Sequence, residues 1–401
     1  MKIHTMKANE TVDSVAKSYG ISTENIYSTN LKGIENATVG EELLILTPTR
    51  TYTLSEGDTL ERLALRFGVR IIDILAQNPY FSEKSSHRGT TLNLKYDDKI
   101  YGSASTNGYL YPGFDKAKLS TALPYLTYVT VCCAIAEEEK IKFCFDPTSL
   151  LKLLYEENKI PLLRIYDKTQ NRNYSEKSSY KDYISKIIDV TMRAGFKGVV
   201  LSCENAKNNF NGFGEFLIEL RRAMIGCDLI LLTEVDETTP GNICELADGN
   251  VLFYHKLIKD DSLSFQDGEK SCYANYAAYA ESAKTFIDIP TLALSAQKFL
   301  PVEDAISAAR MQKAEIKKDN ESLICNFADK KLGRCSFNSL SSVKSTYQLI
   351  DEFGYMGASF DISRTPITYL LMYNACFKTL TNTTTRAVEG CAERRKNTGA
   401  F

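Results

Sequence analysis

An internal repeat at the start of the chain most constrains what this sequence can fold into. Thr11 to Gly20 reads TVDSVAKSYG and Thr59 to Gly68 reads TLERLALRFG, so the offset is 59 − 11 = 48 residues. Asn30 and Asn78 keep the same offset. A repeat of this period indicates two copies of one small structural unit rather than one continuous core.

Each copy has the pattern of a β-α-α-β unit. Apolar residues recur at helical spacing within 11–20 and 59–68, and Gly20 and Gly68 are placed where a left-handed helix cap is needed. Second helices are expected to start near Ser22 and Arg70. The expected strands are 3–6 and 42–46 in the first copy, and 51–54 and 91–94 in the second.

The loops of the second copy resemble those of the LysM module, which binds glycans that contain N-acetylglucosamine, such as peptidoglycan and chitin. The resemblance implies that Gly57, Asp58, Thr59, Asn78 and Pro79 form the glycan-binding loops.

The first copy departs from this loop pattern. Asn9-Glu10-Thr11 stands in place of Gly-Asp-Thr, and Asn30-Leu31 stands in place of Asn-Pro. Weaker sugar binding is therefore expected from the first copy. A generic helical-hairpin repeat without sugar binding is the alternative interpretation of both copies.

Composition places the chain among ordinary globular proteins. Its 401 residues suggest two or three domains, with 44% hydrophobic and 24% charged residues. The net charge is −2 and no basic stripe is visible, so neither a nucleic acid nor an anionic membrane is expected as a partner.

Cysteine and histidine usage argues against disulfides and metals. The chain has 11 cysteines, an odd number, and most are expected to be reduced. His4, His87 and His255 lack the spacing of metal ligands, so no metal and no cofactor are expected. The first 11 residues lack an apolar signal region, and no apolar run approaches the ~20 residues of a membrane span. Synthesis in a cytoplasm, without a secretory signal, is the expectation.

From Asn107 onward, short apolar strands alternate with amphipathic helices. Eight such units predict an α/β fold, a closed (β/α)8 TIM barrel. An open doubly wound sheet is the alternative, but no glycine-rich phosphate loop supports it. The candidate strands are 109–111, 126–134, 162–166, 198–203, 229–234, 251–254, 291–295 and 357–362. The candidate helices include 149–158, 180–194, 212–224, 273–286 and 342–353.

The repeats and the barrel define the expected domains. A small α+β insertion is expected at 301–338, between the seventh strand and the last helix. The predicted boundaries are 1–48 and 49–97 for the two LysM modules, 104–385 for the barrel and 386–401 for a flexible C-terminal tail.

The barrel resembles family 18 glycoside hydrolases, in particular the LysM-bearing branch of bacterial spores that acts on cortex peptidoglycan. The stretches that carry the resemblance are Gly108-Tyr109, Gly195 to Gly198, Leu252 to His255, Glu303 to Ala305, Ala314 to Ile316 and Gly357 to Pro366. Active sites of such barrels lie at the C-terminal ends of the strands. The resemblance implies Glu204 as a remnant general acid, with Tyr254 also at the reaction centre. It implies Tyr109, Ser202, Glu234, His255 and Phe360 as substrate-binding residues.

The catalytic motif itself departs from the family. The pattern Asp-x-x-Asp-x-Asp-x-Glu aligns with Lys197, Val200, Ser202 and Glu204, so only the glutamate is kept. In the family, the aspartate at the position of Ser202 holds the substrate's N-acetyl group, which acts as the nucleophile. A serine cannot supply that negative charge, and losing a comparable stabiliser costs about 10²–10³ in rate.

Two further departures lie on other strands. His255 replaces an aspartate, and Phe360 stands in place of a tryptophan that floors the sugar site.

Three functions remain open from the sequence. The first is a glycan-binding protein whose barrel no longer hydrolyses. The second is a slow or altered N-acetylglucosaminidase that uses Glu204 as acid, with Glu234 in place of the lost aspartate. The third is a structural component of the spore coat or cortex, whose partners would include spore-coat proteins.

Overall fold

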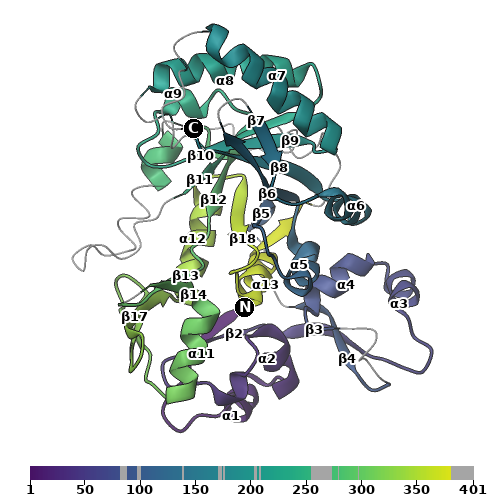
Figure 1. Cartoon of the computed structure of the whole chain (residues 1–401). Coiled ribbons are helices and arrows are strands. Elements are labelled where there is room, and N and C mark those ends of the chain that lie inside the picture. Colours follow the sequence, from purple (N-terminus) through teal and green to yellow (C-terminus); the bar gives the residue numbers. More distant parts are fainter. Residues whose placement is uncertain are drawn as a thin grey trace, which may run out of the picture.

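The computed structural model describes residues 1–81, 88–96, 101–137, 140–169, 174, 177–202, 206, 209–253, 273–278, 280–296 and 298–380. Two small modules and an α+β subdomain surround one end of a larger α/β barrel (Figure 1). Within the described residues, no helix is both long and apolar enough to cross a membrane. The predicted tail at 386–401 lies outside these residues.

The first module is a β-α-α-β unit, as predicted. Its elements are β1 (Lys2–Thr5), α1 (Val12–Tyr19), α2 (Thr23–Thr29), the short 3-10 helix η1 (Ile34–Asn36) and β2 (Glu42–Ile45). Strands β1 and β2 pair in antiparallel fashion. Thr11 caps the start of α1, and Gly20 ends it with a φ of 67°, the left-handed conformation that glycine adopts without strain.

The second module repeats this order. It comprises β3 (Pro48–Thr53), α3 (Leu60–Phe67), α4 (Ile71–Gln77) and β4 (Thr91–Tyr96), and β3 pairs with β4. Gly68 ends α3 with a φ of 66°, as Gly20 ends α1. The prediction of two β-α-α-β units is confirmed, and their strands and helices begin and end within a few residues of the expected positions.

Eight parallel strands close into the predicted barrel. The pairing of the first strand with the second and with the eighth closes the sheet. In chain order the strands are β5 (Gly102–Leu110), β6 (Tyr128–Glu137), β8 (Ile160–Asp167), β9 (Gly198–Ser202), β10 (Ile230–Val235), β11 (Gly249–Leu252), β12 (Thr285–Asp288) and β18 (Gly357–Asp361). Two short strands extend this sheet, β7 (Lys140–Phe143) beside β6 and β19 (Phe377–Thr379) beside β5.

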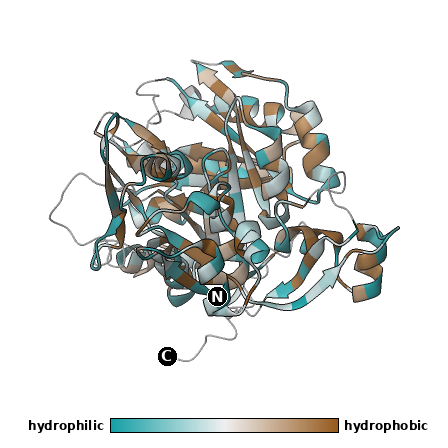
Figure 2. Cartoon of the chain, turned by 90° about the horizontal axis from the view of Figure 1, so that it is seen from below, coloured by the Kyte–Doolittle hydropathy of each residue, from teal (hydrophilic) through white to brown (hydrophobic). Residues whose placement is uncertain are grey.

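Helices surround the barrel (Figure 1). They are α5 (Lys116–Ala122), η2 (Leu123–Tyr125), α6 (Thr148–Glu156), α7 (Lys177–Ala194), α8 (Phe210–Ile225), α9 (Gly241–Cys244), the helical residues 273–278, η4 (Ser282–Lys284), α12 (Leu340–Glu352) and α13 (Ile367–Cys376). Hydrophobic and hydrophilic residues are interspersed along them, as expected for helices with one face on the barrel (Figure 2).

The predicted seventh barrel strand is wrong. Residues 292–294 form β13 of the insertion, whereas the seventh barrel strand is β12, which overlaps the end of the helix predicted at 273–286 and continues into the connection after it. Apolar residues keep helix-like spacing past residue 278, which led to the prediction of a longer helix. The residues Thr285, Phe286 and Ile287 are β-branched or aromatic and favour a strand, and Pro290 follows its end. Closure of the barrel needs eight parallel strands, and β12 completes the set by pairing with β11 and β18.

The insertion is an antiparallel sheet with one helix, and it begins earlier than predicted. The strand order is β14 (Phe299–Pro301), β13 (Leu292–Leu294), β17 (Gly333–Asn338), β16 (Ile324–Asp329) and β15 (Lys317–Lys318). Helix α11 (Val302–Gln312) packs on this sheet around a core that includes Ala305, Phe327 and Phe337.

Candidate functional site: the barrel mouth and the module loops

One inward-facing residue from each barrel strand lies at the C-terminal mouth of the barrel. Side chains alternate along a strand, so the residue two positions beyond each packed interior residue also faces inward. The interior itself is apolar and includes Leu162, Val200, Leu232, Val251 and Phe286. We call the next layer the mouth ring. In strand order it is Tyr111, Cys132, Arg164, Ser202, Glu234, Phe253, Asp288 and Asp361.

Strand β9 carries the remnant of the family motif. Val200 is fully buried in the apolar barrel interior, and Ser202 is half-buried in the mouth ring. A small cavity of about 30 Å³, large enough for one water molecule, lies outside the mouth between the ends of β8 and β9 and helices α7 and α8, where Tyr183, Phe213 and Phe216 line it. Neither Val200 nor Ser202 supplies a carboxylate at the two positions where the family pattern has aspartates.

A buried ion pair crosses the mouth next to Ser202. Glu234 lies opposite Ser202 in the sheet register. The Arg164 guanidinium donates to both carboxylate oxygens of Glu234, at 2.5 and 2.8 Å. Burial acts to lower the pKa of Arg164, but the hydrogen bonds and charge of Glu234 outweigh it and leave the pKa raised. Glu234 thus lies where a substitute for the lost aspartate would be needed, but its charge is already matched by Arg164.

Two further carboxyl groups lie on the opposite side of the ring. Asp288 is half-buried at the end of β12, and Asp361 is half-buried at the end of β18. Burial, with the nearby carboxylates of Asp361 and Glu234, raises the pKa of Asp288 well above its usual range. Burial also raises the pKa of Asp361, although Arg364 at 3.4 Å partly offsets this.

Replacing Asp288 by asparagine is expected to stabilise the protein at neutral pH. Folding raises the pKa of this carboxyl above its unfolded value of about 3.8, so stability is fully present below that pH and is lost as pH rises through the folded pKa. The charges that act on Asp288 are those of Asp361 and Glu234, and Glu234 is itself paired with Arg164. The melting temperature of Asp288→Asn should exceed that of the parent by a few degrees at about pH 7. A gap that stays the same in acid would contradict this.

Tyr109 lies beneath the ring, and Phe360 does not belong to it. Tyr109 is buried in the barrel interior, with Glu234 and Arg164 among its electrostatic neighbours, so the structure places it in the predicted site. Phe360 is fully buried on the outer face of β18, where its ring packs 5.8 Å from that of Tyr373. The predicted role of Phe360 as a sugar floor is therefore corrected, because its neighbours Ser359 and Asp361 take the inward positions.

Three predicted site residues lie outside the described residues. These are Glu204, Tyr254 and His255, which follow β9 and β11. Among the residues that the structure does describe, no group of three or more histidine, cysteine, aspartate or glutamate side chains is arranged to hold a metal ion. None of the eight cysteines in that part of the chain forms a disulfide.

Sequence reasoning missed Arg164 and Asp288. Arg164 carried a usable signal, because a charge in the middle of the apolar run from Leu162 to Ile165 requires a buried partner. Asp288 was missed because the misplaced seventh strand put it in a connection.

The first loop of each module is held by the same hydrogen bonds. In the second module, Asp58 accepts from the Ser55 backbone N–H at 2.8 Å and from the Tyr52 hydroxyl at 2.8 Å. These contacts lower the pKa of Asp58, the backbone hydrogen bond contributing most. Gly57 takes a φ of 81°, and Thr59 caps α3 by accepting from the Arg62 backbone N–H.

The first module keeps this geometry despite its different residues. Glu10 accepts from the Lys7 backbone N–H at 2.8 Å and contacts a His4 ring nitrogen at 2.9 Å. Asn9 takes the left-handed position of Gly57, with a φ of 66°. Lys7, Glu10 and Asn9 each precede their counterparts by 48 residues. The departure at Asn9-Glu10-Thr11 is therefore conservative in structure.

Asn78 shapes its loop from the inside rather than facing solvent. Its side-chain amide donates to the Ile74 and Asn93 carbonyls and accepts from the Asn93 N–H. Asn30 makes the same contacts in the first module. The side chain of Asn78 is buried, so it holds the loop that continues into the half-buried Pro79 rather than presenting its amide to a ligand.

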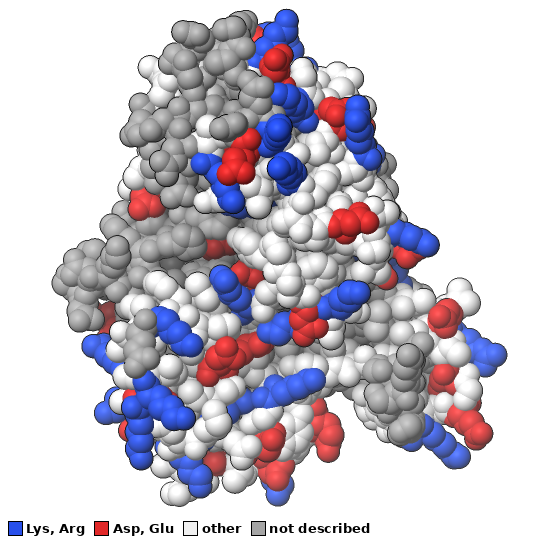
Figure 3. All heavy atoms as spheres, in the orientation of Figure 1, with Lys and Arg blue, Asp and Glu red and all other residues white. Residues whose placement is uncertain are grey.

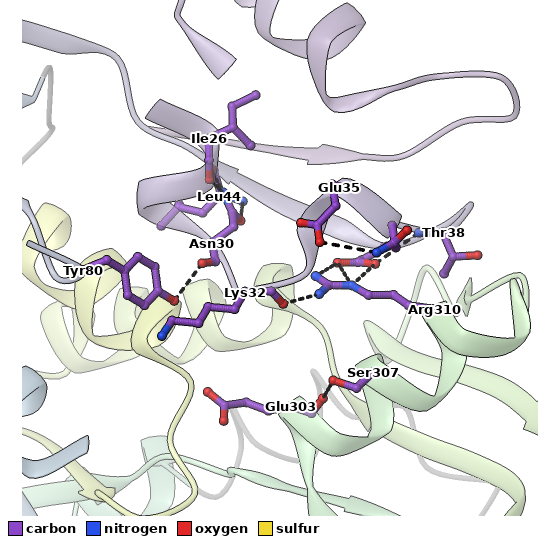
Figure 4. Close-up of polar contacts among 12 residues, drawn as sticks. Ile26, Asn30, Lys32, Glu35, Thr38, Leu44, Tyr80, Glu303, Ser307 and Arg310 are labelled. Atoms are coloured by element: carbon purple, nitrogen blue, oxygen red, sulfur yellow. Dashed lines mark hydrogen bonds and ion pairs between the residues drawn. The ribbon is translucent and has the colours of Figure 1, made fainter. Parts of the chain in front are cut away.

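The second loop of the first module is docked within the molecule (Figure 4). Arg310 of α11 donates to the Lys32 carbonyl at 2.7 Å and to the Glu41 carboxylate at 2.6 Å. The hydroxyl of Tyr80, from the second module, donates to the Asn30 carbonyl at 2.9 Å. These contacts occupy carbonyl groups on the loop of the first module.

Nearby backbone contacts extend this docking. The Ile316 N–H donates to the Val39 carbonyl, and the Thr38 hydroxyl donates to the Ala314 carbonyl. Gly40 has a φ of 83°, and a Cβ there would meet the Ile316 carbonyl oxygen. The first module and the insertion therefore fit together closely.

Comparison with known proteins identifies the repeats. Residues 4–45 and 52–86 match the family model of the LysM domain. The two N-terminal modules are LysM domains. The match covers most of each predicted unit and confirms the resemblance of both copies to the LysM module.

Solved structures also resemble the barrel, either together with the LysM domains or alone. The spore cortex-lytic enzyme SleL of Bacillus cereus aligns with a TM-score of 0.73 at 18% identity, over 95% of this chain and 100% of that chain. SleL of Bacillus megaterium QM B1551 aligns with 0.72 at 16% identity, over 95% and 99%. A chitinase of Chromobacterium violaceum aligns with 0.60 at 16% identity, over 68% and 98%. The chain thus combines two LysM domains with a chitinase-like barrel.

One curated relative is similar in sequence. It is YdhD of Bacillus subtilis (strain 168), named as a sporulation-specific glycosylase, which is 23% identical over 257 residues. The aligned region spans 61% of this chain and 60% of the length of that relative.

Proposed function

We propose that this protein binds N-acetylglucosamine-containing glycan, peptidoglycan or chitin, through its LysM domains and does not hydrolyse it by the family 18 mechanism. The proposal rests on the second LysM domain. Hydrogen bonds of Asp58 hold its first loop, and hydrogen bonds of Asn78 hold its second. The names of the relatives, a spore cortex-lytic enzyme and a sporulation-specific glycosylase, support the bacterial spore as the place where this glycan is met.

The mouth ring supports the loss of hydrolysis. A substrate-assisted mechanism needs a carboxylate that orients and stabilises the reacting N-acetyl group, and such preorganised charge supplies much of the rate. Ser202 and Val200 offer none on β9, and Glu234 is paired with Arg164. On this proposal, Glu204 is a remnant of the family's general acid.

Binding to insoluble peptidoglycan tests the proposal through a matched pair of variants. Asp58→Ala removes the carboxylate that holds the first loop of the second LysM domain by hydrogen bonds. Glu10→Ala removes the corresponding carboxylate of the first LysM domain. We expect Asp58→Ala to lower the apparent affinity about tenfold, a loss of ~1.4 kcal/mol. Glu10→Ala should have little effect, because the other loop of that domain already contacts Arg310.

Two results would contradict this expectation in different ways. Failure of the unaltered protein to sediment with peptidoglycan or chitin would refute glycan binding. Equal losses from the two variants would leave glycan binding intact but refute the unequal contribution of the two domains.

A slow hydrolase remains the second candidate, and one observation favours it. Three carboxyl side chains, Glu234 on β10, Asp288 on β12 and Asp361 on β18, face the mouth, and the pKa of Asp288 is raised chiefly by burial, as a proton donor requires. A structural role in the spore coat, with coat proteins as partners, is the third.

On the described part of the face in Figure 3, basic and acidic residues are interspersed. Such a mixed surface fits contact with a largely uncharged glycan or with other proteins better than attraction to a polyanion.

A further inference from the structure

The charges of the mouth ring are not balanced. Glu234 pairs with Arg164, and Asp361 has Arg364 at 3.4 Å. In the described part of the chain, no hydrogen bond or ion pair reaches the side chain of Asp288, and the charges that act on it are those of the Asp361 and Glu234 carboxylates. A carboxyl group placed among carboxyl groups at a half-buried position is unfavourable unless a cation or a strong donor joins it.

A second, independent feature points to a missing ligand at the same place. Tyr109 is only 1% exposed and lies near Glu234 and Arg164, and its hydroxyl has no hydrogen-bond partner among the residues that the structure describes. On the neighbouring strand, the Ser359 hydroxyl is also buried without a partner within that part of the chain, and Ser359 lies opposite Asp288 in the sheet register. Buried hydroxyl groups are normally hydrogen-bonded, so the polar lining of this side of the mouth is incomplete as it stands.

Aromatic rings flank the same carboxyl groups. Tyr111 stacks on Tyr109 with ring centroids 6.2 Å apart, and Phe253 meets Tyr109 edge-on at 5.8 Å. Both Tyr111 and Phe253 are half-buried, so each residue keeps some accessible surface. Aromatic side chains beside carboxyl groups suit a ligand that combines an apolar ring face with a positive charge.

We propose that the mouth ring binds an amino sugar whose amino group is free, a glucosamine unit, with Asp288 and Asp361 accepting from its ammonium group. Tyr111 and Phe253 pack against the sugar ring, and hydroxyl groups of the sugar reach the polar side chains below. The usual N-acetylated unit is disfavoured, because its neutral amide leaves the charge of Asp288 unmatched. Ser202 moreover stands in place of the family aspartate that holds the acetamide.

This inference rests on the proposed function only in that both ligands are glycans. The LysM domains bind the N-acetylated chain, whereas the mouth selects a de-N-acetylated unit. The two sites therefore respond to different sugars and to different variants.

Calorimetric titration of the full chain tests the inference, with the fully deacetylated glucosamine disaccharide and N,N′-diacetylchitobiose as probes. The unaltered protein should bind the glucosamine disaccharide at least about tenfold more tightly than the acetylated one. Asp288→Asn and Asp361→Asn should each weaken that binding about tenfold, and added salt should weaken it as well. Asp304→Asn, an exposed aspartate on α11, is the matched control and should leave it unchanged.

The outcomes separate this inference from the proposed function. If the glucosamine disaccharide does not bind, or if Asp288→Asn and Asp361→Asn bind it as the unaltered protein does, the mouth site is refuted. Tighter binding of the acetylated disaccharide, lost in the same variants, would refute the preference for a free amino group. Asp58→Ala should leave glucosamine binding intact while it weakens sedimentation with peptidoglycan, and Asp288→Asn should do the reverse.

Discussion

Replacing Arg310 by alanine should cost about 3–5 kcal/mol of unfolding free energy, because it leaves Glu41 charged and buried without its partner. The side chains of Arg310 and Glu41 are only 6% and 4% exposed, and three hydrogen bonds join them. The same change also frees the Lys32 carbonyl. Denaturant unfolding should show the loss, and hydrogen exchange should place it in the first LysM domain and the insertion.

Two further variants serve as comparisons for the stability of Arg310→Ala. Arg222→Ala removes an exposed guanidinium from an i,i+3 pair with Glu219 and should cost no more than about 1 kcal/mol. Converting both members of the buried pair, Arg310→Met with Glu41→Met, should recover most of the stability, because two apolar side chains leave no unpaired charge. A loss below about 1 kcal/mol for Arg310→Ala would contradict the docking described here.

Turnover of a chromogenic chitobioside should lie at least 10²–10³-fold below an ordinary glycosidase rate of about 1–10³ s⁻¹. The reason is the absence of a carboxylate at Ser202 to stabilise the reacting N-acetyl group, a loss of about 3–4 kcal/mol in the transition state. Glu204→Gln should then change nothing measurable. Turnover at an ordinary rate that Glu204→Gln abolishes would show that the barrel is an active hydrolase.

A single restoring change is more informative than a double one. Ser202→Asp places a carboxylate on the half-buried mouth position and should raise any residual turnover. Val200→Asp would instead place a charge among Leu162, Leu232 and other apolar side chains of the barrel interior, where it has no partner. A melting temperature that falls only in Val200→Asp would confirm that this position has become part of the packed core.

Local sequence signals were enough to predict the modules and most of the barrel. Helix caps such as Gly20 and Gly68 act within one turn, and apolar periodicity marks α1 and α3 directly. The failure at β12 has a different origin. A four-residue strand carries little local signal, and its identity depends on pairing with β11 and β18, which are distant along the chain.

The prediction of individual site residues also depended on whether local signals were sufficient. Ser202 and Glu234 were predicted because their strands were assigned correctly and alternation fixes which face they occupy. Phe360 was misplaced by one position of that alternation, which is enough to move a side chain from the barrel interior to the helix layer. No sequence pattern predicts that Arg310 docks on Glu41, because the two residues are 269 positions apart.

The place where the second LysM domain joins the barrel has a geometric consequence. The Tyr125 hydroxyl donates to the Ala76 carbonyl of α4, and Tyr125 directly precedes β6, at the end of the barrel where strands begin. The mouth ring lies at the other end, where strands finish. The insertion nevertheless links the LysM domains to the mouth side. Arg310 of α11 holds Glu41 of the first LysM domain, and Glu303 of the same helix accepts from Lys118, which also donates to the Ser363 carbonyl just beyond β18. The two LysM domains are thus held by contacts at both ends of the barrel strands, so they should keep a fixed orientation relative to the mouth rather than move freely about a linker.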